Sequence, residues 1–199
     1  LGLLGCGTVG RGVARLIKEN QQDIQRRVGA PVEIHRILVR DKSSDRGPHV
    51  DANRVTTRAE AILDDPYIDI VVELMGGMDP TLHYVNSALQ QNRHVVTANK
   101  ALIATHGNAL FATAQECGVA LRFEAAVAGG IPVIRSLREG LASDRVERIV
   151  AILNGTSNFI LTQMSTTGTP YANALSNAQT AGYAEADPTL DVGGFDAAQ

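Results

Sequence analysis

The sequence predicts an α/β fold in which a parallel sheet is covered by helices on both faces. Short apolar runs alternate with stretches of helical spacing, a pattern typical of parallel strands joined by crossover helices. The run IDIVVELM at residues 68–75 is apolar almost throughout, as expected of a strand covered on both sides. With 199 residues, 44% of them hydrophobic, the chain has room for one full domain and part of a second.

Each element is assigned from its own pattern. Strands are expected where apolar and branched residues run together, and helices where apolar residues recur every three or four positions. The expected strands are residues 1–4, 32–39, 68–75, 94–97, 120–125 and 146–153. A first helix is expected from the spacing of Val9 through Val28, and further helices at residues 58–63, 81–91 and 107–117.

The character of the sequence changes after Ala126. The stretch AVAGGIPVIRSLREGLA begins with small residues and continues with a helical pattern, which Pro132 opens at a first-turn position. The stretch ILNGTSNFILTQM then passes from an expected strand through a polar turn into another helix. We therefore expect a first domain at residues 1–126 and part of a second at residues 127–199.

Composition narrows the class of partner. The net charge is −3 and the basic residues are scattered, so no nucleic acid or anionic membrane partner is expected. No apolar run approaches the length that crosses a bilayer. The two cysteines and five histidines show no disulfide or metal spacing. We expect a cytoplasmic protein that binds small molecules, and the first residue, a leucine, suggests that an upstream segment is missing.

A glycine-rich turn follows the first strand. GCGTVG at residues 5–10 matches G-x-G-x-x-G and opens a helix, where Gly5 permits a tight turn, Gly7 a close pyrophosphate and Gly10 close helix packing. The helix N-terminus offers N–H groups to phosphates. The alternative is a glycine turn with a structural role only. We predict a Rossmann-type NAD(P)-binding domain whose cofactor contacts include Gly5, Cys6, Gly7, Thr8, Val9 and Gly10.

The end of the second strand bears on cofactor choice. An acidic residue there accepts a hydrogen bond from the adenosine ribose, whereas a cation accommodates a 2′-phosphate. This strand ends ILVRDKSS, so Arg40 and Lys42 favour NADP while Asp41 keeps NAD possible. The alternative is a solvated turn of mixed charge.

Polar residues end two later strands. Asn99 and Lys100 follow the strand at residues 94–97, at the edge where open α/β sheets bind ligands. Lys100 is therefore a candidate to orient a carbonyl or carboxylate beside the nicotinamide, and the alternative is a surface lysine. Glu73 ends the neighbouring strand and is expected either to line the same crevice or to be solvated.

Six stretches together resemble the homoserine dehydrogenase family. They span nearly the whole chain in order: GLLGCGTVGRGV, VVELMGG, VVTANKALIA, FEAAVAGGIPVI, LNGTSNFIL and GYAEADPTLDVGGFDAAQ. The resemblance implies hydride transfer between NAD(P) and the pair homoserine and aspartate 4-semialdehyde, in the aspartate pathway to threonine, methionine and isoleucine. It also implies a substrate and dimerisation domain after the nucleotide-binding domain, and a homodimer of the full-length protein.

The resemblance assigns roles to individual residues. Thr97 and Lys100 lie where the family contacts cofactor and substrate, and Lys100 has a possible share in proton transfer. Glu185 corresponds to the substrate-binding glutamate and Asp196 to an aspartate that holds the substrate and belongs to the catalytic set. A monovalent cation such as sodium is expected at Glu124 and the carbonyls of Val127, Gly129 and Ile131.

Several of these residues also allow a structural interpretation. Asn154 and Thr156 lie in NGTSN, which either contacts the substrate or caps a helix. Asp187 and Asp191 are expected to shape their loop, and without the resemblance the whole acidic run reads as a solvated loop. The family's proton-transfer lysine falls at position 200, so low turnover is expected of the 199 residues alone.

Other functions remain open from the sequence. The other classes are a different Rossmann oxidoreductase acting on a small carbonyl compound and a nucleotide sensor without chemistry. The leading hypothesis requires Lys100 and the late acids to converge on one amino-aldehyde.

Overall fold

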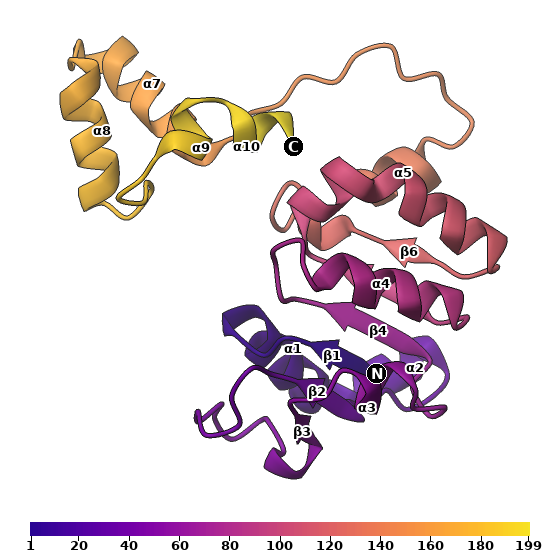
Figure 1. The fold of residues 1–199 in the computed structure, drawn as a ribbon. Helices are drawn as coiled ribbons and strands as arrows, with labels where there is room; N and C mark the ends of the chain where they lie inside the picture. Colours follow the sequence, from indigo (N-terminus) through magenta and orange to yellow (C-terminus); the bar gives the residue numbers. More distant parts are fainter. The chain divides into compact units, whose positions relative to one another are not determined.

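The computed structural model describes residues 1–199, which form two compact units at residues 1–137 and 138–199 (Figure 1). The first unit is built on a six-stranded parallel sheet in the order β3-β2-β1-β4-β5-β6. Its strands are β1 (Gly2–Leu4), β2 (Arg36–Leu38), β3 (Val55–Thr56), β4 (Ile70–Glu73), β5 (His94–Thr97) and β6 (Leu121–Arg122). The strand order reverses between β1 and β4, and this is the topological switch point of a Rossmann fold.

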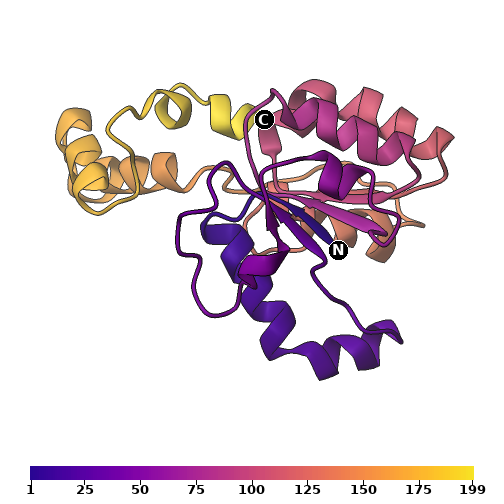
Figure 2. The same cartoon turned by 60° about the horizontal axis from the view of Figure 1, so that its bottom comes forward.

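Helices cover both faces of this sheet, as predicted (Figure 2). Helices α1 and α2 lie on one face, and α4 and α5 lie on the other. The helices of this unit are α1 (Thr8–Glu19), α2 (Gln21–Val28), α3 (Glu60–Leu63), α4 (Thr81–Gln90), α5 (Lys100–Glu116) and α6 (Val133–Arg135). Short 3-10 turns occur at η1 (Ala52–Arg54) and η2 (Glu124–Ala126), and a π turn, η3 (Ser136–Gly140), begins at the end of this unit and continues into the second.

Successive side chains of the strands point to opposite faces of the sheet and form two hydrophobic clusters. Leu4 and Val71 face the side of α4 and α5, where they join a buried cluster with Val85, Leu89 and Leu102. Leu3 and Ile37 point to the opposite face and form a smaller cluster on the α1 side. Because successive strand residues face opposite sides, both faces of β1 are apolar and both are covered.

The glycine turn brings α1 close to β1. A side chain at Gly10 would place its Cβ 2.6 Å from the carbonyl oxygen of Gly5, which is closer than real contacts allow. Gly5 has φ +100°, and a Cβ there would lie 2.8 Å from the carbonyl oxygen of Leu74. Both positions therefore require glycine, for close packing and for a left-handed backbone respectively.

Several strand predictions are too long. The stretch at residues 32–39 forms strand only at Arg36–Leu38, and that at 120–125 only at Leu121–Arg122. Residues 146–153 form no strand, and their side chains include Val150 at 85% and Ile152 at 74% exposure. A strand needs hydrogen-bonding neighbours, and the sequence pattern cannot show whether a neighbour exists.

The C-terminal unit is helical. It contains α7 (Gly155–Thr167), α8 (Tyr171–Thr180), α9 (Thr189–Val192) and α10 (Phe195–Ala198). Its core consists of Ile160, Ala174, Ala178 and Ala184, with Phe159 and Leu175 packed against them. No helix in either unit is long and apolar enough to cross a membrane.

The first unit extends past the expected boundary at Ala126. Both carboxylate oxygens of Glu124 accept hydrogen bonds from the start of α6, Oε1 from Ile134 N at 2.9 Å and Oε2 from Arg135 N at 2.8 Å. These bonds attach the segment after Ala126 to the sheet unit, so the compact unit ends at Leu137.

The glycine packing leads to a paired prediction in α1. Gly10→Ala should lower the free energy of unfolding by about 1–3 kcal/mol, because the new methyl group has no space against Gly5. Gly12→Ala, which meets nothing within 4 Å, should raise it by up to about 1 kcal/mol through helix propensity. Urea unfolding followed by circular dichroism measures both, and equal effects of the two changes would contradict the packing argument.

Candidate functional site

The glycine turn lies at the switch point of the sheet. Gly5 N donates to the carbonyl oxygen of Leu38 at 3.0 Å, and Gly5 also approaches Leu74, so the turn lies between the ends of β2 and β4. Gly7 is the N-cap of α1, and no side chain caps the helix. A Cβ at Gly7 would meet nothing within 4 Å. The turn thus offers uncapped N–H groups and an open approach, which fit a pyrophosphate.

The other turn residues differ in what they offer. The side chain of Cys6 is partly buried and packs against the cluster of Leu3 and Ile37. Burial raises the pKa of the Cys6 thiol, and the charges of Arg46 and Arg11 oppose that shift. Two further turn residues, Thr8 and Val9, are exposed at the start of α1.

The chain after β2 presents cations to solvent. Arg40 and Lys42 are exposed and form no ion pair. Asp41, between them, accepts hydrogen bonds from its own loop at Ser43 and Ser44. The pKa of the Asp41 carboxyl is lowered by the Ser43 hydroxyl first and by the Ser43 N–H next. Arg40 and Lys42 thus face solvent, whereas the carboxylate of Asp41 is hydrogen-bonded within its loop.

Glu73 is fully buried, so the expectation of a solvated strand end is wrong. Its Oε1 accepts from Met75 N at 2.7 Å and Gly76 N at 3.1 Å, and its Oε2 accepts from Thr97 Oγ1 at 2.5 Å. Glu73 and Thr97 are paired residues of β4 and β5, so their side chains share one face of the sheet. The carboxylate therefore ties together the carboxyl ends of two strands, and the expectation that the stretch VVELMGG lines the crevice stays a prediction.

Thr97 and Asn99 complete this network. Thr97 is buried, and its hydroxyl accepts from Asn99 N at 3.0 Å while donating to Glu73. Asn99 Nδ2 donates to the carbonyl oxygen of Gly77 at 2.6 Å, and its Oδ1 accepts from Leu102 N at 3.0 Å as the N-cap of α5. The predicted cofactor contact of Thr97 stays a prediction, and its hydroxyl already holds two partners.

Lys100 is the first residue of α5 and is half-buried. It follows Asn99 directly, so the network that fixes the helix cap also fixes the backbone from which the lysine extends. This is the carboxyl edge of the sheet, where ligands of such folds bind. The position of Lys100 therefore agrees with the role that the sequence suggested, and the role itself stays a prediction.

The expected cation ligands occupy a capped turn. Besides Glu124, which caps α6, the carbonyl oxygen of Ile131 accepts from Val133 N at 2.8 Å. Gly129 has a left-handed backbone with φ +58°. No group of three or more His, Cys, Asp or Glu side chains forms a metal site. The assignment of a monovalent cation to Glu124, Val127, Gly129 and Ile131 stays a prediction from the resemblance.

Two acids of the C-terminal unit meet on one asparagine. Asn154 Nδ2 donates to Asp191 Oδ1 at 2.8 Å and to Asp196 Oδ2 at 3.0 Å. Asn154 Oδ1 accepts from Ser157 N at 2.7 Å and caps α7, and Ser157 Oγ donates to the carbonyl oxygen of Asp191 at 3.1 Å. Asn154 thus caps a helix, as one alternative predicted, and orients two carboxylates, while its contact with a substrate stays a prediction.

Sequence analysis missed the position of Asp191, which was expected only to shape its loop. A signal existed in the glycine pair between Asp191 and Asp196. Gly194 has φ +76°, a left-handed backbone that starts α10 and turns the chain back. That turn lets two acids five positions apart reach one amide.

The remaining polar residues of this unit have separate environments. Thr156 is buried, and its hydroxyl donates to the carbonyl oxygen of Tyr183 at 2.5 Å. Glu185 is exposed. Asp187 accepts from the hydroxyl of Thr189 at 2.5 Å and its N–H at 3.1 Å, bonds that lower the pKa of the Asp187 carboxyl. Asp187 therefore shapes its loop, as predicted.

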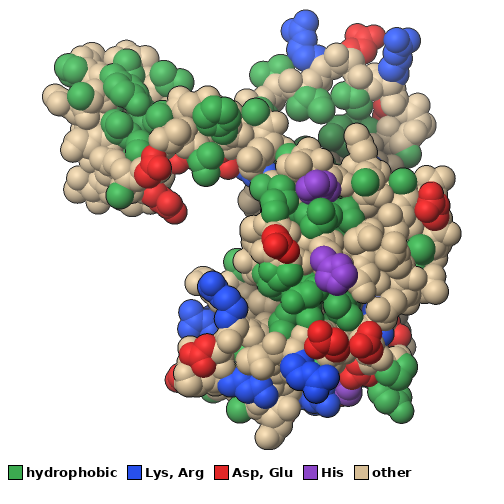
Figure 3. Space-filling view, viewed as in Figure 1, with side chains coloured by type: hydrophobic (Ala, Val, Ile, Leu, Met, Phe, Trp, Pro, Cys, Tyr) green, Lys and Arg blue, Asp and Glu red, His purple; other side chains and the backbone are tan.

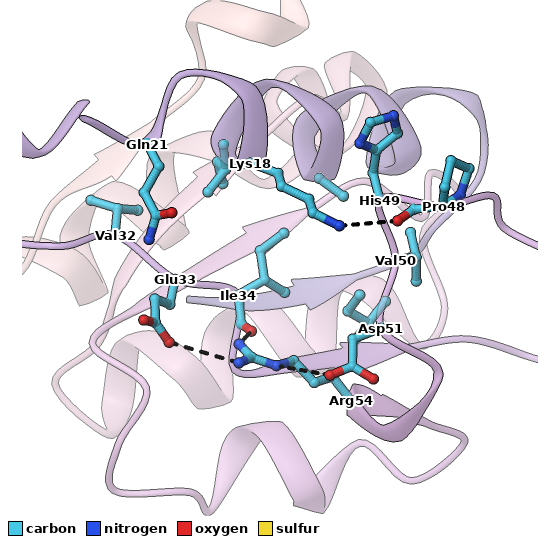
Figure 4. Close-up of a pocket in the computed structure, with 13 residues that line it drawn as sticks. Lys18, Gln21, Val32, Glu33, Ile34, Pro48, His49, Val50, Asp51 and Arg54 are labelled. Carbon is cyan, nitrogen blue, oxygen red and sulfur yellow. Dashed lines mark hydrogen bonds and ion pairs between the residues drawn. The ribbon is translucent and has the colours of Figure 1, made fainter. Parts of the chain in front are cut away.

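A cavity of about 290 Å³ lies elsewhere on the first unit (Figure 4). It is bounded by the C-terminal half of α1 and the segment that leads into β2, at the end of the sheet opposite the glycine turn. Its cations are already engaged: Lys18 Nζ donates to the carbonyl oxygen of Pro48 at 3.1 Å, and Arg54 lies 3.7 Å from Glu33 and 3.6 Å from Asp51. It brings together none of the predicted site residues.

The fold and the glycine turn define the first unit as a Rossmann dinucleotide-binding domain. A family model described as the NAD-binding domain of homoserine dehydrogenase matches residues 5–124, and a second, homoserine dehydrogenase, matches residues 132–199. The chain belongs to the homoserine dehydrogenase family.

Known proteins agree over the whole chain. It is 48% identical over 199 residues to homoserine dehydrogenase of Bacillus subtilis and 47% identical over 200 residues to that of Pseudomonas aeruginosa. All of this chain is covered, with 46% and 45% of the two relatives, so it spans about half the length of the curated relatives it matches.

Solved structures give the same result. A homoserine dehydrogenase from Thiobacillus denitrificans is similar with a TM-score of 0.88 and 48% identity, over 98% of this chain and 45% of that one. A hyperthermophilic archaeal homoserine dehydrogenase in complex with NADPH has a TM-score of 0.81 and 29% identity, over 98% and 65%.

The buried carboxylate leads to a stability prediction. Glu73→Gln should lower the free energy of unfolding by about 1–3 kcal/mol, because an amide cannot accept from both the loop N–H groups and Thr97. Glu116→Gln, at an exposed position of α5, should change it by no more than about 0.5 kcal/mol. Denaturant unfolding of the two variants measures the difference, and its absence would contradict the role of Glu73.

The Asn154 cluster leads to a pH-dependent prediction. Asn154→Asp places a third carboxylate beside Asp191 and Asp196, so it should cost roughly 1–2 kcal/mol of stability near pH 7. The loss should shrink near pH 4, where carboxyl groups begin to protonate. Asn173→Asp, at an exposed first-turn position of α8, is the control. Thermal unfolding at both pH values tests this, and a loss independent of pH would contradict charge repulsion.

Proposed function

We propose that this chain provides the cofactor-binding part and the beginning of the substrate-binding part of a homoserine dehydrogenase. The reaction is the NAD(P)-dependent interconversion of L-homoserine and L-aspartate 4-semialdehyde, in the pathway to threonine, methionine and isoleucine. The observation that carries the proposal is the glycine turn at the switch point of the sheet, in a chain whose two parts both match models of this family.

The proposed cofactor site runs from the glycine turn to the end of β2. The backbone of residues 5–10 and the uncapped start of α1 would hold the pyrophosphate. Arg40 and Lys42 would face a 2′-phosphate, so NADP is the preferred cofactor. The NADPH complex of the archaeal homoserine dehydrogenase supports this preference. When bound, the nicotinamide supplies or accepts the hydride.

The proposed substrate site is assigned from the charges of the substrate and from the resemblance. Homoserine and its aldehyde each carry an ammonium and a carboxylate, so a pocket for them needs an anion and a cation. Glu185 would bind the ammonium, and Asp196, oriented by Asn154, would hold the reacting end. Lys100 would position the substrate and share in moving the proton at the substrate oxygen. Thr156 would support this pocket from the first turn of α7.

Further parts of the proposal follow from the resemblance. Residues 1–126 would be the nucleotide-binding domain, and residues 127–199 part of a substrate and dimerisation domain. The exposed apolar side chains at Ile149, Val150, Ile152 and Leu153 support further contacts for this segment, as in a homodimer. Glu124 would hold a monovalent cation such as sodium, which would take no part in the hydride transfer. The protein would act in the cytoplasm.

The substrate assignment is tested in a polypeptide that extends over the full length of the relatives. With aspartate 4-semialdehyde it should oxidise NADPH, followed by absorbance. Glu185→Ala should raise KM for the aldehyde about tenfold or more, because a hydrogen bond to a charged group is lost. It should leave KM for NADPH unchanged. Glu116→Ala, at an exposed position of α5 outside that loop, is the control. The absence of aldehyde-dependent NADPH oxidation would refute the activity. An equal rise in KM for the aldehyde and for NADPH would refute the role of Glu185.

A further inference from the structure

The loop after β2 holds its acidic residue in an unexpected way. In Rossmann proteins, an acid at this position accepts from the ribose 2′-hydroxyl of NAD. Here Asp41 Oδ1 accepts from Ser43 N at 2.8 Å, while Oδ2 accepts from Ser43 Oγ at 2.6 Å and from Ser44 Oγ at 3.3 Å. Both oxygens of the carboxylate are therefore turned toward its own loop.

Arg46 closes the same loop. Its guanidinium donates to the carbonyl oxygen of Asp41 and, at 2.7 Å, to that of Ser44. These bonds fasten the backbone on both sides of Ser43. The Arg46 Nε is buried without a hydrogen-bond partner, and the residue as a whole is half-buried.

The closed loop lies beside the glycine turn. Gly5 N donates to the carbonyl oxygen of Leu38, the last residue of β2, at 3.0 Å, so the loop begins beside that turn. In the space-filling view, Lys and Arg side chains lie among Asp and Glu side chains over the region where Figure 1 places α1, β2 and β3 (Figure 3). Arg40 and Lys42 extend from this loop into solvent. The loop thus presents Arg40 and Lys42 to solvent while its Asp41 carboxylate faces inward, and its second acid, Asp45, accepts from Gly47 N at 2.9 Å.

We propose that Ser43, Ser44 and Arg46 form a lock on cofactor choice, which keeps the Asp41 carboxylate away from the ribose 2′-hydroxyl and so disfavours NAD. The inference rests on the proposed binding of NAD(P) by this domain. In the locked loop, a 2′-phosphate meets Arg40 and Lys42, and a 2′-hydroxyl meets no acceptor. A carboxylate released from its serines would accept from the 2′-hydroxyl and repel a 2′-phosphate, so the two cofactors respond in opposite directions.

The test is the ratio of the Kd values of the 199-residue chain for NADH and NADPH, measured by fluorescence titration. The wild-type chain should bind NADPH more tightly. The double variant Ser43→Ala with Ser44→Ala removes both donors to Asp41 Oδ2 and should shift the ratio toward NADH about tenfold or more, as expected for one hydrogen bond to a charged group. Adding Asp41→Asn to the double variant should reverse that shift.

The outcomes separate this inference from the proposed function. Tighter binding of NADPH by the wild type, with an unchanged ratio in the double variant, would overturn the lock and leave the proposed function standing. A shift that survives Asp41→Asn would also overturn it, because the carboxylate would not be its cause. A wild-type chain that prefers NADH contradicts the lock, and one that binds neither cofactor contradicts the proposed cofactor site as well.

Discussion

The close contact between Gly10 and Gly5 is the constraint on which the rest of the first unit depends. Because neither residue has a side chain, α1 starts directly against the end of β1, between the ends of β2 and β4. The uncapped helix start then points to the edge where the strand order reverses. The predicted cofactor residues Arg40 and Lys42 follow β2, which ends beside this turn, and the network after β4 and β5 lies at the same carboxyl edge of the sheet.

Buried hydrogen bonds, rather than exposed charges, fix the geometry around this edge. Glu73 joins β4 to β5 through Thr97, and Asn99 joins the next turn to the loop at Gly77. Each polar group in this network has a partner, as burial requires. The C-terminal unit uses the same device, since one amide of Asn154 orients two carboxylates. In each unit, an asparagine caps a helix whose first turn contains a predicted site residue. Asn99 caps α5, which begins at Lys100, and Asn154 caps α7, which contains Thr156.

The sequence predicted this architecture because periodicity reports which faces are buried. The strand at His94–Thr97 and the helix that begins at Thr81 are found where predicted, since their apolar patterns are bounded by clear turn residues. Periodicity does not report partners. Residues 146–153 are apolar enough for a strand, yet the described chain gives them no ladder. The environment of Glu73 could not be predicted for a related reason. Its carboxylate oxygens accept hydrogen bonds from Thr97 on another strand and from the loop that follows β4.

The central claim is that the glycine turn and the loop after β2 bind the cofactor, and amide chemical-shift mapping of the 21.1 kDa chain tests it most directly. On addition of NADPH, the largest shifts should fall on Gly7, Thr8 and the backbone of residues 40–44. Gln21 and Glu33, in the cavity at the opposite end of the sheet, should stay unshifted. Shifts confined to that cavity, with the glycine turn unaffected, would contradict the account.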